Sequence, residues 1–514
     1  MKRLLPWIAV LLLATAVRAP SLTAARPYMS YVDEGNYLHV SARMVRDRHW
    51  IPDTFMYPSL PTSAVAAAAR AMDPFYRMAH EGRSIRSELL TKSSNYYDVL
   101  EPFELLLLGR VLSFLAGLGV VLVTGLLARR VAGQRAGLLA AFTAALLPAL
   151  VARGGIAMVD PYATLFVAAC LLFTERTRVS DRPGREALLA GAMAGLAFAS
   201  KYPAILVSLA FALTVGLTRS ERLRLWTIGA AGAIGAALLA MPGLLVVPDK
   251  VFGGMRRQSE LYAKLTSPPL WPQVFERAEW DLPYPGPELG WIFVVLALAG
   301  LAVALRDRRT RPSALGWTLF LALNLTLYLR QSFQPFRNLL PLVPIACVAV
   351  GVLYERLRER VPRKIWVDAA AFLLIAALFA PPVVRFARER ARFEDSRTQT
   401  IDWLSRRSFP DDTVLVLDHL AFMPSEIIRL KGKIVEIHPW EVLQRRLRSR
   451  QVRYLVITQM STPEGRQLIG PEELKVILRR YELRVRFGQE ATTPHPGQWH
   501  SNRQTIHVLE RRRH

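Results

Sequence analysis

Cysteine is nearly absent from this sequence, and several classes of protein are excluded with it. Among 514 residues only Cys170 and Cys347 occur, and both lie inside apolar runs. Two such cysteines supply neither a disulfide framework nor a zinc site, and we expect both to be small buried hydrophobic residues. The sequence also contains no aromatic-plus-basic RNA motif, no helix-turn-helix and no zinc-finger spacing.

Acidic residues are few relative to basic ones, which leaves a formal net charge of +25. Such a charge is compatible with nucleic-acid binding. Here, however, the arginines cluster in short segments between apolar runs, and arginines in such loops set the orientation of membrane proteins. We therefore predict no nucleic-acid partner.

Long apolar runs are confined to residues 1–388, whereas residues 389–514 read as an ordinary soluble domain. A bilayer core about 30 Å thick requires about 17–25 apolar residues per spanning helix. Eleven candidate spans, several of them short or interrupted, lie at 4–17, 105–128, 136–152, 157–174, 187–200, 202–218, 225–247, 289–305, 313–329, 338–354 and 366–384. The predicted fold is a mainly α polytopic membrane protein with about eleven transmembrane helices and a C-terminal soluble α/β domain.

The run 187–218 is interrupted only by Lys201. As a single helix it would be about 48 Å long, too long for a simple crossing, whereas two helices that turn at 200–203 both fit. Two crossings also place the arginine-rich segments on one side, the cytoplasmic side. These segments lie at 129–135, 176–185, 219–224, 306–311 and 356–364.

This topology predicts a multi-pass protein of the cytoplasmic membrane with residues 18–103, 249–288 and the C-terminal domain on the outer side. A cleaved signal peptide is an alternative for residues 1–20, because Lys2-Arg3 precede a short apolar stretch and small residues. Cleavage would leave ten spans and would not change the side on which any later loop lies.

The C-terminal domain alternates β-rich runs with amphipathic segments, which predicts a partly parallel sheet. Strands are expected at 413–418, 433–437, 454–458, 483–487 and 505–510, and helices near 397–407, 421–430, 439–450 and 471–481. No GxGxxG or P-loop occurs there, so nucleotide binding is not indicated. His419 and His438 follow strand ends, where single histidines are usually structural. We interpret the domain as one for acceptor recognition or packing.

The first outer segment contains adjacent carboxylates, Asp33 and Glu34, soon after the first apolar run. Apolar residues then recur at helical spacing, which predicts an amphipathic helix on the membrane surface with the acids at its start. Asp33 has a simple alternative role as a cap that favours the helix N-terminus. Capping does not explain the second acid or the aromatic-rich stretch around Tyr57, and the sequence leaves both roles open.

Three further charged residues fall at the outer ends of predicted spans. Asp160 precedes Pro161 at a helix start, where a cap is the simple role; with Asp33 it would suit proton abstraction from a hydroxyl. Lys201 interrupts apolar sequence, which is costly unless it faces a cavity or snorkels to the interface. Together with Arg337, which follows Arg330, it could stabilise a lipid phosphate.

The order of these motifs resembles that of C-type glycosyltransferases of family 39, the protein O-mannosyltransferases and lipid A aminoarabinose transferases. The sequence has Arg18-Ala19-Pro20, then Asp33-Glu34-Gly35-Asn36-Tyr37, then YPSL at 57–60. VDP at 159–161, GLAFASKYPA at 195–204 and FRNLLPLVP at 336–344 fall where such proteins have similar motifs. The likeness covers roughly residues 1–385.

The resemblance implies a GT-C fold and an enzyme that takes sugar from a polyprenyl-phosphate carrier, acts on the non-cytoplasmic face and inverts the anomeric carbon. It implies that Asp33 is the general base on the acceptor and that Glu34 supports it. The other implied site residues either position acceptor or donor (Asp160, Tyr37, Tyr57) or hold the donor phosphate (Lys201, Arg337, Arg330). Some such enzymes bind a divalent cation near the carboxylates, and the sequence leaves metal binding open.

Three departures and three alternatives accompany this hypothesis. Residues 62–100 carry no recognisable motif, Asn338 stands where an aromatic residue is common, and the C-terminal domain matches no familiar acceptor domain. The sugar therefore stays open, as does the acceptor, whether lipid, glycan or protein. The alternatives are a transporter or flippase of lipid-linked glycan, disfavoured by the lack of repeats, an oligosaccharide or O-antigen ligase, and a membrane-anchored scaffold.

Overall fold

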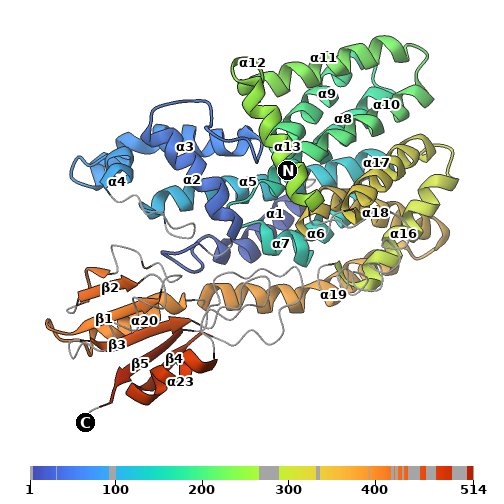
Figure 1. The fold of residues 1–514 in the computed structure, drawn as a ribbon. Helices are drawn as coiled ribbons and strands as arrows, with labels where there is room; N and C mark the ends of the chain where they lie inside the picture. Colours follow the sequence, from blue (N-terminus) through green and yellow to red (C-terminus); the bar gives the residue numbers. More distant parts are fainter. Residues whose placement is uncertain are drawn as a thin grey trace. The chain divides into compact units, whose positions relative to one another are not determined.

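The computed structural model describes residues 4–29, 32–91, 100–264, 289–330, 336–392, 394–417, 422, 427–430, 433–437, 452–458, 471–488 and 506–512. The chain forms two compact units (Figure 1). The first, the helical unit, comprises residues 1–23, 37–75 and 107–391, and the second, the sheet unit, comprises residues 24–36, 76–106 and 392–514. The predicted domain boundary at 388/389 stays a prediction.

Two helices, α2 (Val32–Arg46) and α3 (Ser59–Ala79), run from one unit into the other, as does α5 (Phe103–Ala132). The remaining segments of the helical unit are α1 (Leu5–Arg18), η1 (Ala19–Ser21), α6 (Gln134–Leu146), α7 (Pro148–Arg153), α8 (Asp160–Val179), α9 (Pro183–Ser200), η2 (Tyr202–Leu206), α10 (Val207–Thr218), α11 (Arg222–Ala240), α12 (Gly243–Val246), α13 (Pro248–Lys264), α16 (Trp291–Arg306), α17 (Arg311–Leu329), η3 (Phe336–Leu342), α18 (Val343–Arg360) and α19 (Lys364–Arg392).

All eleven predicted apolar runs coincide with helical segments, as the predicted fold class requires. Five described helices are long and apolar enough to cross a membrane: Phe103–Ala132, Arg222–Ala240, Arg311–Leu329, Phe336–Arg360 and Lys364–Ser405. Shorter apolar helices cover Leu5–Ser21, Tyr202–Thr218 and Trp291–Arg306. The predicted break at Lys201 is confirmed, since α9 ends at Ser200 and η2 begins at Tyr202. The run predicted at 136–152 is two helices, α6 and α7, because Pro148 begins a new one.

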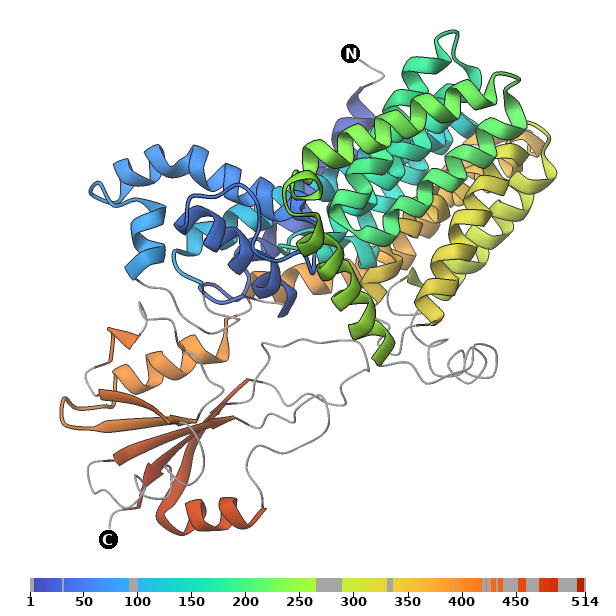
Figure 2. The same ribbon diagram turned by 45° about the horizontal axis from the view of Figure 1, so that its top comes forward.

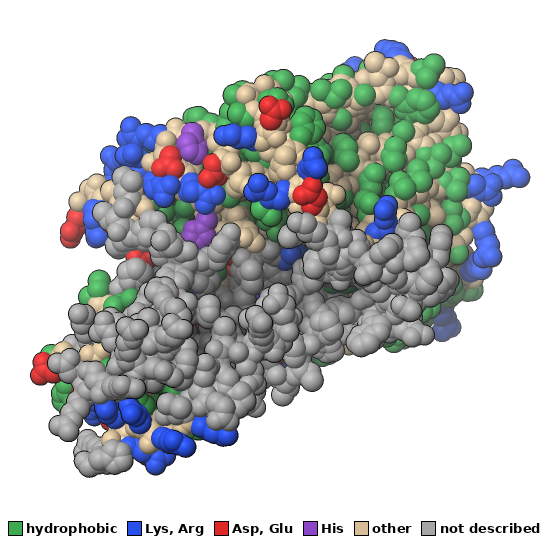
Figure 3. All heavy atoms as spheres, viewed as in Figure 1, with side chains coloured by type: hydrophobic (Ala, Val, Ile, Leu, Met, Phe, Trp, Pro, Cys, Tyr) green, Lys and Arg blue, Asp and Glu red, His purple; other side chains and the backbone are tan. Residues whose placement is uncertain are grey.

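Close packing in the helical unit depends on small residues. Helix α9 packs against α8 and α11, and a Cβ atom at Gly191 would lie 1.8 Å from the carbonyl oxygen of Gly229. Only glycine permits this backbone approach, as is common between membrane helices. The outward side of α11 is apolar, with Leu239 87% exposed, and Figure 3 shows hydrophobic side chains covering the region of α10, α11 and α17. An apolar exterior of this kind suits contact with lipid.

Helix α1 is joined to the bundle through a buried arginine. Arg18 is fully buried and donates hydrogen bonds to the carbonyl oxygens of Ala144 (3.0 Å) and Ala145 (2.8 Å) in α6. The carbonyl groups at the end of α6 compensate part of the cost of burying this cation. The two predicted buried cysteines, Cys170 and Cys347, are confirmed as buried free thiols.

The sheet unit contains a five-stranded sheet in the order β2-β1-β3-β5-β4. Its strands are β1 (Thr413–Leu417), β2 (Lys433–Ile437), β3 (Val452–Thr458), β4 (Tyr481–Phe487) and β5 (Ile506–Arg511), and its helices include α4 (Ile85–Thr91), α20 (Ser396–Ser405) and α23 (Pro471–Arg480). Strand β1 is parallel to β2 and β3, whereas β5 is antiparallel to β3 and β4. The predicted partly parallel sheet is confirmed.

Alternation of side chains gives the sheet two apolar faces. Ile401 of α20 packs with Val414 on one face, and Ile477 of α23 packs with Leu415 on the other. Figure 2 shows the two helices on opposite faces of the strands. His419, His438, the predicted helix 439–450 and half of 421–430 lie outside the described residues.

Candidate active site

Lys201 lies in the extended turn between α9 and η2 and forms two short polar contacts. Its Nζ atom lies 2.6 Å from Oδ1 of Asp160 and 2.8 Å from Oδ1 of Asn338. The lysine side chain is 19% exposed and that of Asp160 only 3%. The ammonium group therefore compensates a nearly buried carboxylate while keeping limited access to solvent.

Asp160 begins α8, where Pro161 fixes the backbone angle of the first turn. A carboxylate is favourable at this end because it lies at the positive end of the helix dipole. The side chain does more than cap, since it forms an ion pair with Lys201 from a different helix. The sequence did not predict the contact between Asp160 and Lys201, which the structure shows; the roles of both residues stay predictions.

Asn338 is the third member of this group, and the sequence did not identify it as a site residue. It lies in η3, which packs against α8, and its amide oxygen accepts from Lys201. The sequence did show an unexpected polar residue where an aromatic one is common. That departure was the available signal, because a polar side chain at a span start needs a partner.

The two predicted phosphate-binding arginines come from the same stretch of chain. Arg337 directly precedes Asn338 in η3, and Arg330 follows the last residue of α17. Residues 331–335 lie outside the described part of the chain. Arg153, at the end of α7, lies over the ring of Phe336 at 5.7 Å and adds a further cation beside η3. Binding of phosphate by Arg337 and Arg330 stays a prediction.

Two tyrosines meet next to Asp160. Tyr37 of α2 is buried, and its side chain lies beside the hydroxyl group of Tyr162 in the first turn of α8, as does that of Ser113. Ser113 also accepts from the backbone N–H of Met158 and donates to its carbonyl oxygen, both at 3.1 Å. The sequence did not identify Tyr162 or Ser113, although Tyr162 directly follows the VDP motif.

The predicted acid couplet stands at the start of the helix that carries Tyr37. Asp33 and Glu34 belong to the first turn of α2, and Asp33 precedes Tyr37 by four residues, which is about one helical turn. The helix predicted there is present as α2, and its place on the membrane surface stays a prediction. Glu34 is fully buried, and the side chain of Asp33 lies outside the description. Convergence of the couplet with Lys201 stays a prediction.

The loop that contains Tyr57 is anchored beside Lys201. Tyr202, the next residue after the lysine, donates from its hydroxyl to the carbonyl oxygen of Phe55 at 2.8 Å. Ser59 donates to the carbonyl oxygen of Ala240 at 3.3 Å. Phe55 and Tyr202 also share an apolar cluster. These contacts hold the loop around Tyr57 at the same end of the helical unit as Lys201.

The described residues do not form a metal site. No three His, Cys, Asp or Glu side chains among them gather closely enough to hold an ion. Asp160, the nearest carboxylate to Lys201, is already engaged by the ammonium group, which would repel a cation.

Comparisons with known proteins concern the sequence and the fold of the chain. The family model of dolichyl-phosphate-mannose-protein mannosyltransferases matches residues 106–245, a stretch that includes Asp160 and Lys201. ArnT from Cupriavidus metallidurans, solved with undecaprenyl phosphate, superposes with a TM-score of 0.58 at 12% identity over 98% of both chains. The chain has the GT-C fold. As a GT-C chain it is a polytopic membrane protein and resembles family 39 glycosyltransferases.

A second group of GT-C proteins is similar at the level of fold. The archaeal oligosaccharyltransferase AglB from Archaeoglobus fulgidus, solved with an inhibitory peptide and a dolichol-phosphate, gives a TM-score of 0.52 at 13% identity. That match covers 89% of the present chain and 69% of AglB. A search of curated protein sequences gives no match. The likeness to both solved proteins therefore establishes the fold and leaves the reaction to be argued from the site.

Proposed function

We propose that this protein transfers a single sugar from a polyprenyl-phosphate carrier to a hydroxyl or phosphate group of an acceptor on the outer side of the membrane. The observation that carries the proposal is the group of Lys201, Asp160 and Asn338, which lies where α8 begins and α9 ends. The Nζ atom of Lys201 lies 2.6 Å from the carboxylate of Asp160 and 2.8 Å from the amide oxygen of Asn338. These contacts orient the ammonium group, and the lysine side chain remains 19% exposed. The match to the mannosyltransferase model over the same helices supports it.

Lys201 is suited to bind the phosphate of the donor. An ammonium group has three N–H donors, and two of them are directed to Asp160 and Asn338. The third is left to donate to a phosphate oxygen. Arg337, the neighbour of Asn338 in η3, would add a second cation on the same phosphate, where a guanidinium can bind two oxygens at once.

Asp33 would act as the general base. It accepts the proton of the acceptor hydroxyl, the acceptor oxygen attacks C1 of the sugar, and the bond between C1 and the phosphate oxygen breaks with inversion. Electrons of the broken bond leave with the polyprenyl phosphate, whose added negative charge Lys201 and Arg337 stabilise. Glu34 would support the base, and Tyr37, Tyr57 and Asp160 would position the acceptor or the sugar.

Donor turnover by the purified protein tests this proposal. The protein is reconstituted in liposomes with a panel of polyprenyl-monophosphate sugars and an extract of envelope acceptors. One donor is expected to be consumed, with Asp33→Asn reducing its turnover by at least ~100-fold, since a positioned base contributes about 10²–10⁴. Asp53→Asn is the matched control, because that acid pairs with Arg43 on the surface. Undiminished turnover in Asp33→Asn would overturn the assignment of the base.

A further inference from the structure

A cavity lies at the end of the helical unit opposite Lys201. It has a volume of about 620 Å³ and is bordered by the C-terminal turns of α5 and α8, the loop after α8 and the start of α9. Asp160 begins α8, and Leu172, the lining residue of α8 nearest to it, comes twelve residues later, so about 18 Å of helix separates the cavity from the candidate active site. The cavity is therefore a different site.

The lining divides into an apolar wall and a cationic end. Leu126 and Leu172 contribute apolar side chains, and the cations Arg129, Arg130 and Arg176 follow them along the same helices. An apolar surface that ends in guanidinium groups matches an amphiphilic ligand, one part hydrocarbon and one part anion.

The cations of this cavity differ from nearby arginines that have structural partners. Arg178 forms an ion pair with Glu175 at 3.1 Å, and Arg219 donates to the carbonyl oxygens of Thr177 and Ser180. These contacts hold the loop after α8 in place.

Arg129 and Arg130 have fewer polar contacts than these arginines. Within the described residues, the side chain of neither arginine forms a hydrogen bond or an ion pair within 4 Å. Arg130 interacts with Glu175 electrostatically over a longer distance. Arg176 reaches Glu186 only at 4.0 Å. Three arginines and two carboxylates, Asp181 and Glu186, line the cavity, so its lining keeps a net positive charge.

We propose that this cavity binds the headgroup of an anionic phospholipid. A phosphodiester would accept hydrogen bonds from Arg130 and Arg176, and an acyl chain would run along Leu126 and Leu172. Basic pockets between transmembrane helices bind anionic lipid headgroups in this way. The carboxylates of Asp181 and Glu186, also on the lining, can accept hydrogen bonds from a glycerol headgroup and repel a free phosphate dianion. Phosphatidylglycerol fits these requirements, and the inference does not depend on sugar transfer.

Lipid binding to the purified full-length protein tests the proposal. Phosphatidylglycerol, phosphatidylcholine and inorganic phosphate are each titrated into the detergent-solubilised protein, and bound molecules are counted by native mass spectrometry. The expected result is one phosphatidylglycerol bound at least ~10-fold more tightly than phosphatidylcholine, with no competition by inorganic phosphate. Equal binding of the two lipids, or displacement of the lipid by inorganic phosphate, would overturn the proposal.

A pair of variants locates the site. Arg130→Gln/Arg176→Gln is expected to weaken phosphatidylglycerol binding by about 10-fold or more, because two charge-assisted hydrogen bonds are lost. The control Arg306→Gln/Arg308→Gln removes the same charge from exposed arginines of another loop and is expected to change the affinity less than about twofold. Equal losses in both variants would indicate a general charge effect and contradict the site. The lipid selectivity of the wild type decides the question even if the first variant does not fold.

Discussion

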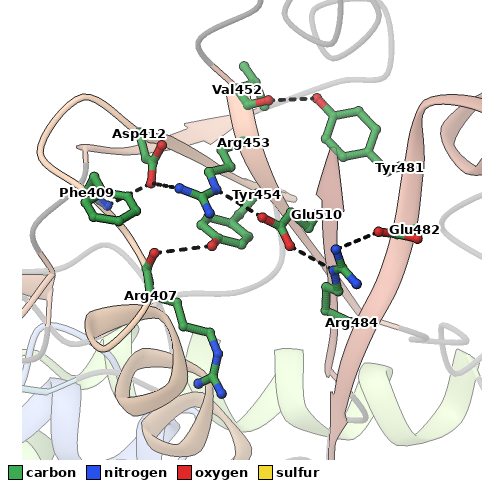
Figure 4. Close-up of polar contacts among 10 residues, drawn as sticks. All are labelled: Arg407, Phe409, Asp412, Val452, Arg453, Tyr454, Tyr481, Glu482, Arg484 and Glu510. Carbon is green, nitrogen blue, oxygen red and sulfur yellow. Dashed lines mark hydrogen bonds and ion pairs between the residues drawn. The ribbon is translucent and has the colours of Figure 1, made fainter. Parts of the chain in front are cut away.

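Two charged networks, one in the sheet unit and one in the helical unit, differ in how fully their cations are paired. In the sheet unit, Arg453 lies 3.1 Å from carboxylate oxygens of both Asp412 and Glu510, and Arg484 lies 2.8 Å from Glu510 (Figure 4). Arg453 also lies over the ring of Phe409 at 5.3 Å. Arg453 is paired with two carboxylates and one aromatic ring, so this network joins β3 to β5 and to the segment before β1.

The Lys201 group has a different balance. Its cation has one carboxylate and one neutral amide as partners, so it is oriented but not surrounded by negative charge. A phosphate that approaches it meets an N–H donor rather than a second carboxylate. The two cations therefore differ in the number of acids around them: Arg453 has two carboxylate partners and Lys201 has one.

Substitution of Lys201 should give the largest change in donor turnover among the variants of the two networks. Lys201→Met is expected to lower donor turnover by at least ~100-fold, because the leaving phosphate loses its nearest cation. Arg484→Met in the sheet, the matched control, is expected to change turnover less than about twofold. Turnover is measured by release of polyprenyl phosphate in liposomes.

The lysine variant also leaves a buried carboxylate without its partner, which costs about 3–5 kcal/mol. Lys201→Met/Asp160→Asn removes both charges and is expected to restore folding, measured as melting temperature, while turnover stays low. Recovery of turnover in the double variant would show that Lys201 serves folding only.

Substitution of Asp160 alone should have an intermediate effect on donor turnover. Asp160→Asn keeps an oxygen acceptor for Lys201 but removes the charge-assisted part of the hydrogen bond, so the ammonium group is held less firmly. A fall of about tenfold in kcat/KM for the donor is expected, measured beside the surface control Asp53→Asn. A change confined to thermal stability would contradict a positioning role.

Asn338 sharpens the argument about charge balance. Asn338→Asp would surround Lys201 with two carboxylates, as Arg453 is surrounded, and repel the donor phosphate. The KM for the donor is expected to rise about fivefold, which corresponds to about 1 kcal/mol, while kcat changes less. Asn338→Leu, which adds no charge, should raise the KM by a smaller factor, and a larger effect of the leucine variant would contradict the electrostatic explanation.

The smallest effect is expected in the sheet network. Arg453→Met should lower the free energy of unfolding of the sheet unit by about 1 kcal/mol, because partly exposed ion pairs contribute little each. Turnover should stay within about twofold of the wild type. A loss of turnover comparable with that of Lys201→Met would show that the sheet arginines take part in the reaction.

Much of the helical unit could be predicted because apolar length and arginine position are local features of the sequence. The break at Lys201 followed from a span that was too long and from Pro203. The strands of the sheet unit followed from alternating apolar residues. The break at Pro148 was missed, although the proline was the signal, because the apolar run continues through it.

The candidate site was only partly predictable. Asp160 and Lys201 were identified because charge at the edge of a span is costly and needs a reason. Their third partner, Asn338, and the neighbour Tyr162 were not, because the sequence does not reveal which residues of η3 and α8 face one another across the bundle. Contacts between residues 137 positions apart depend on tertiary packing.

Equilibrium binding of polyprenyl phosphate tests the central claim most directly. The affinity of the purified wild type is compared with that of Lys201→Met/Asp160→Asn, which keeps the buried charges balanced, and of Arg484→Met. The account predicts a loss of at least ~10-fold in the double variant and none in the sheet variant. Equal affinity in all three proteins would contradict the assignment of Lys201 to the donor phosphate.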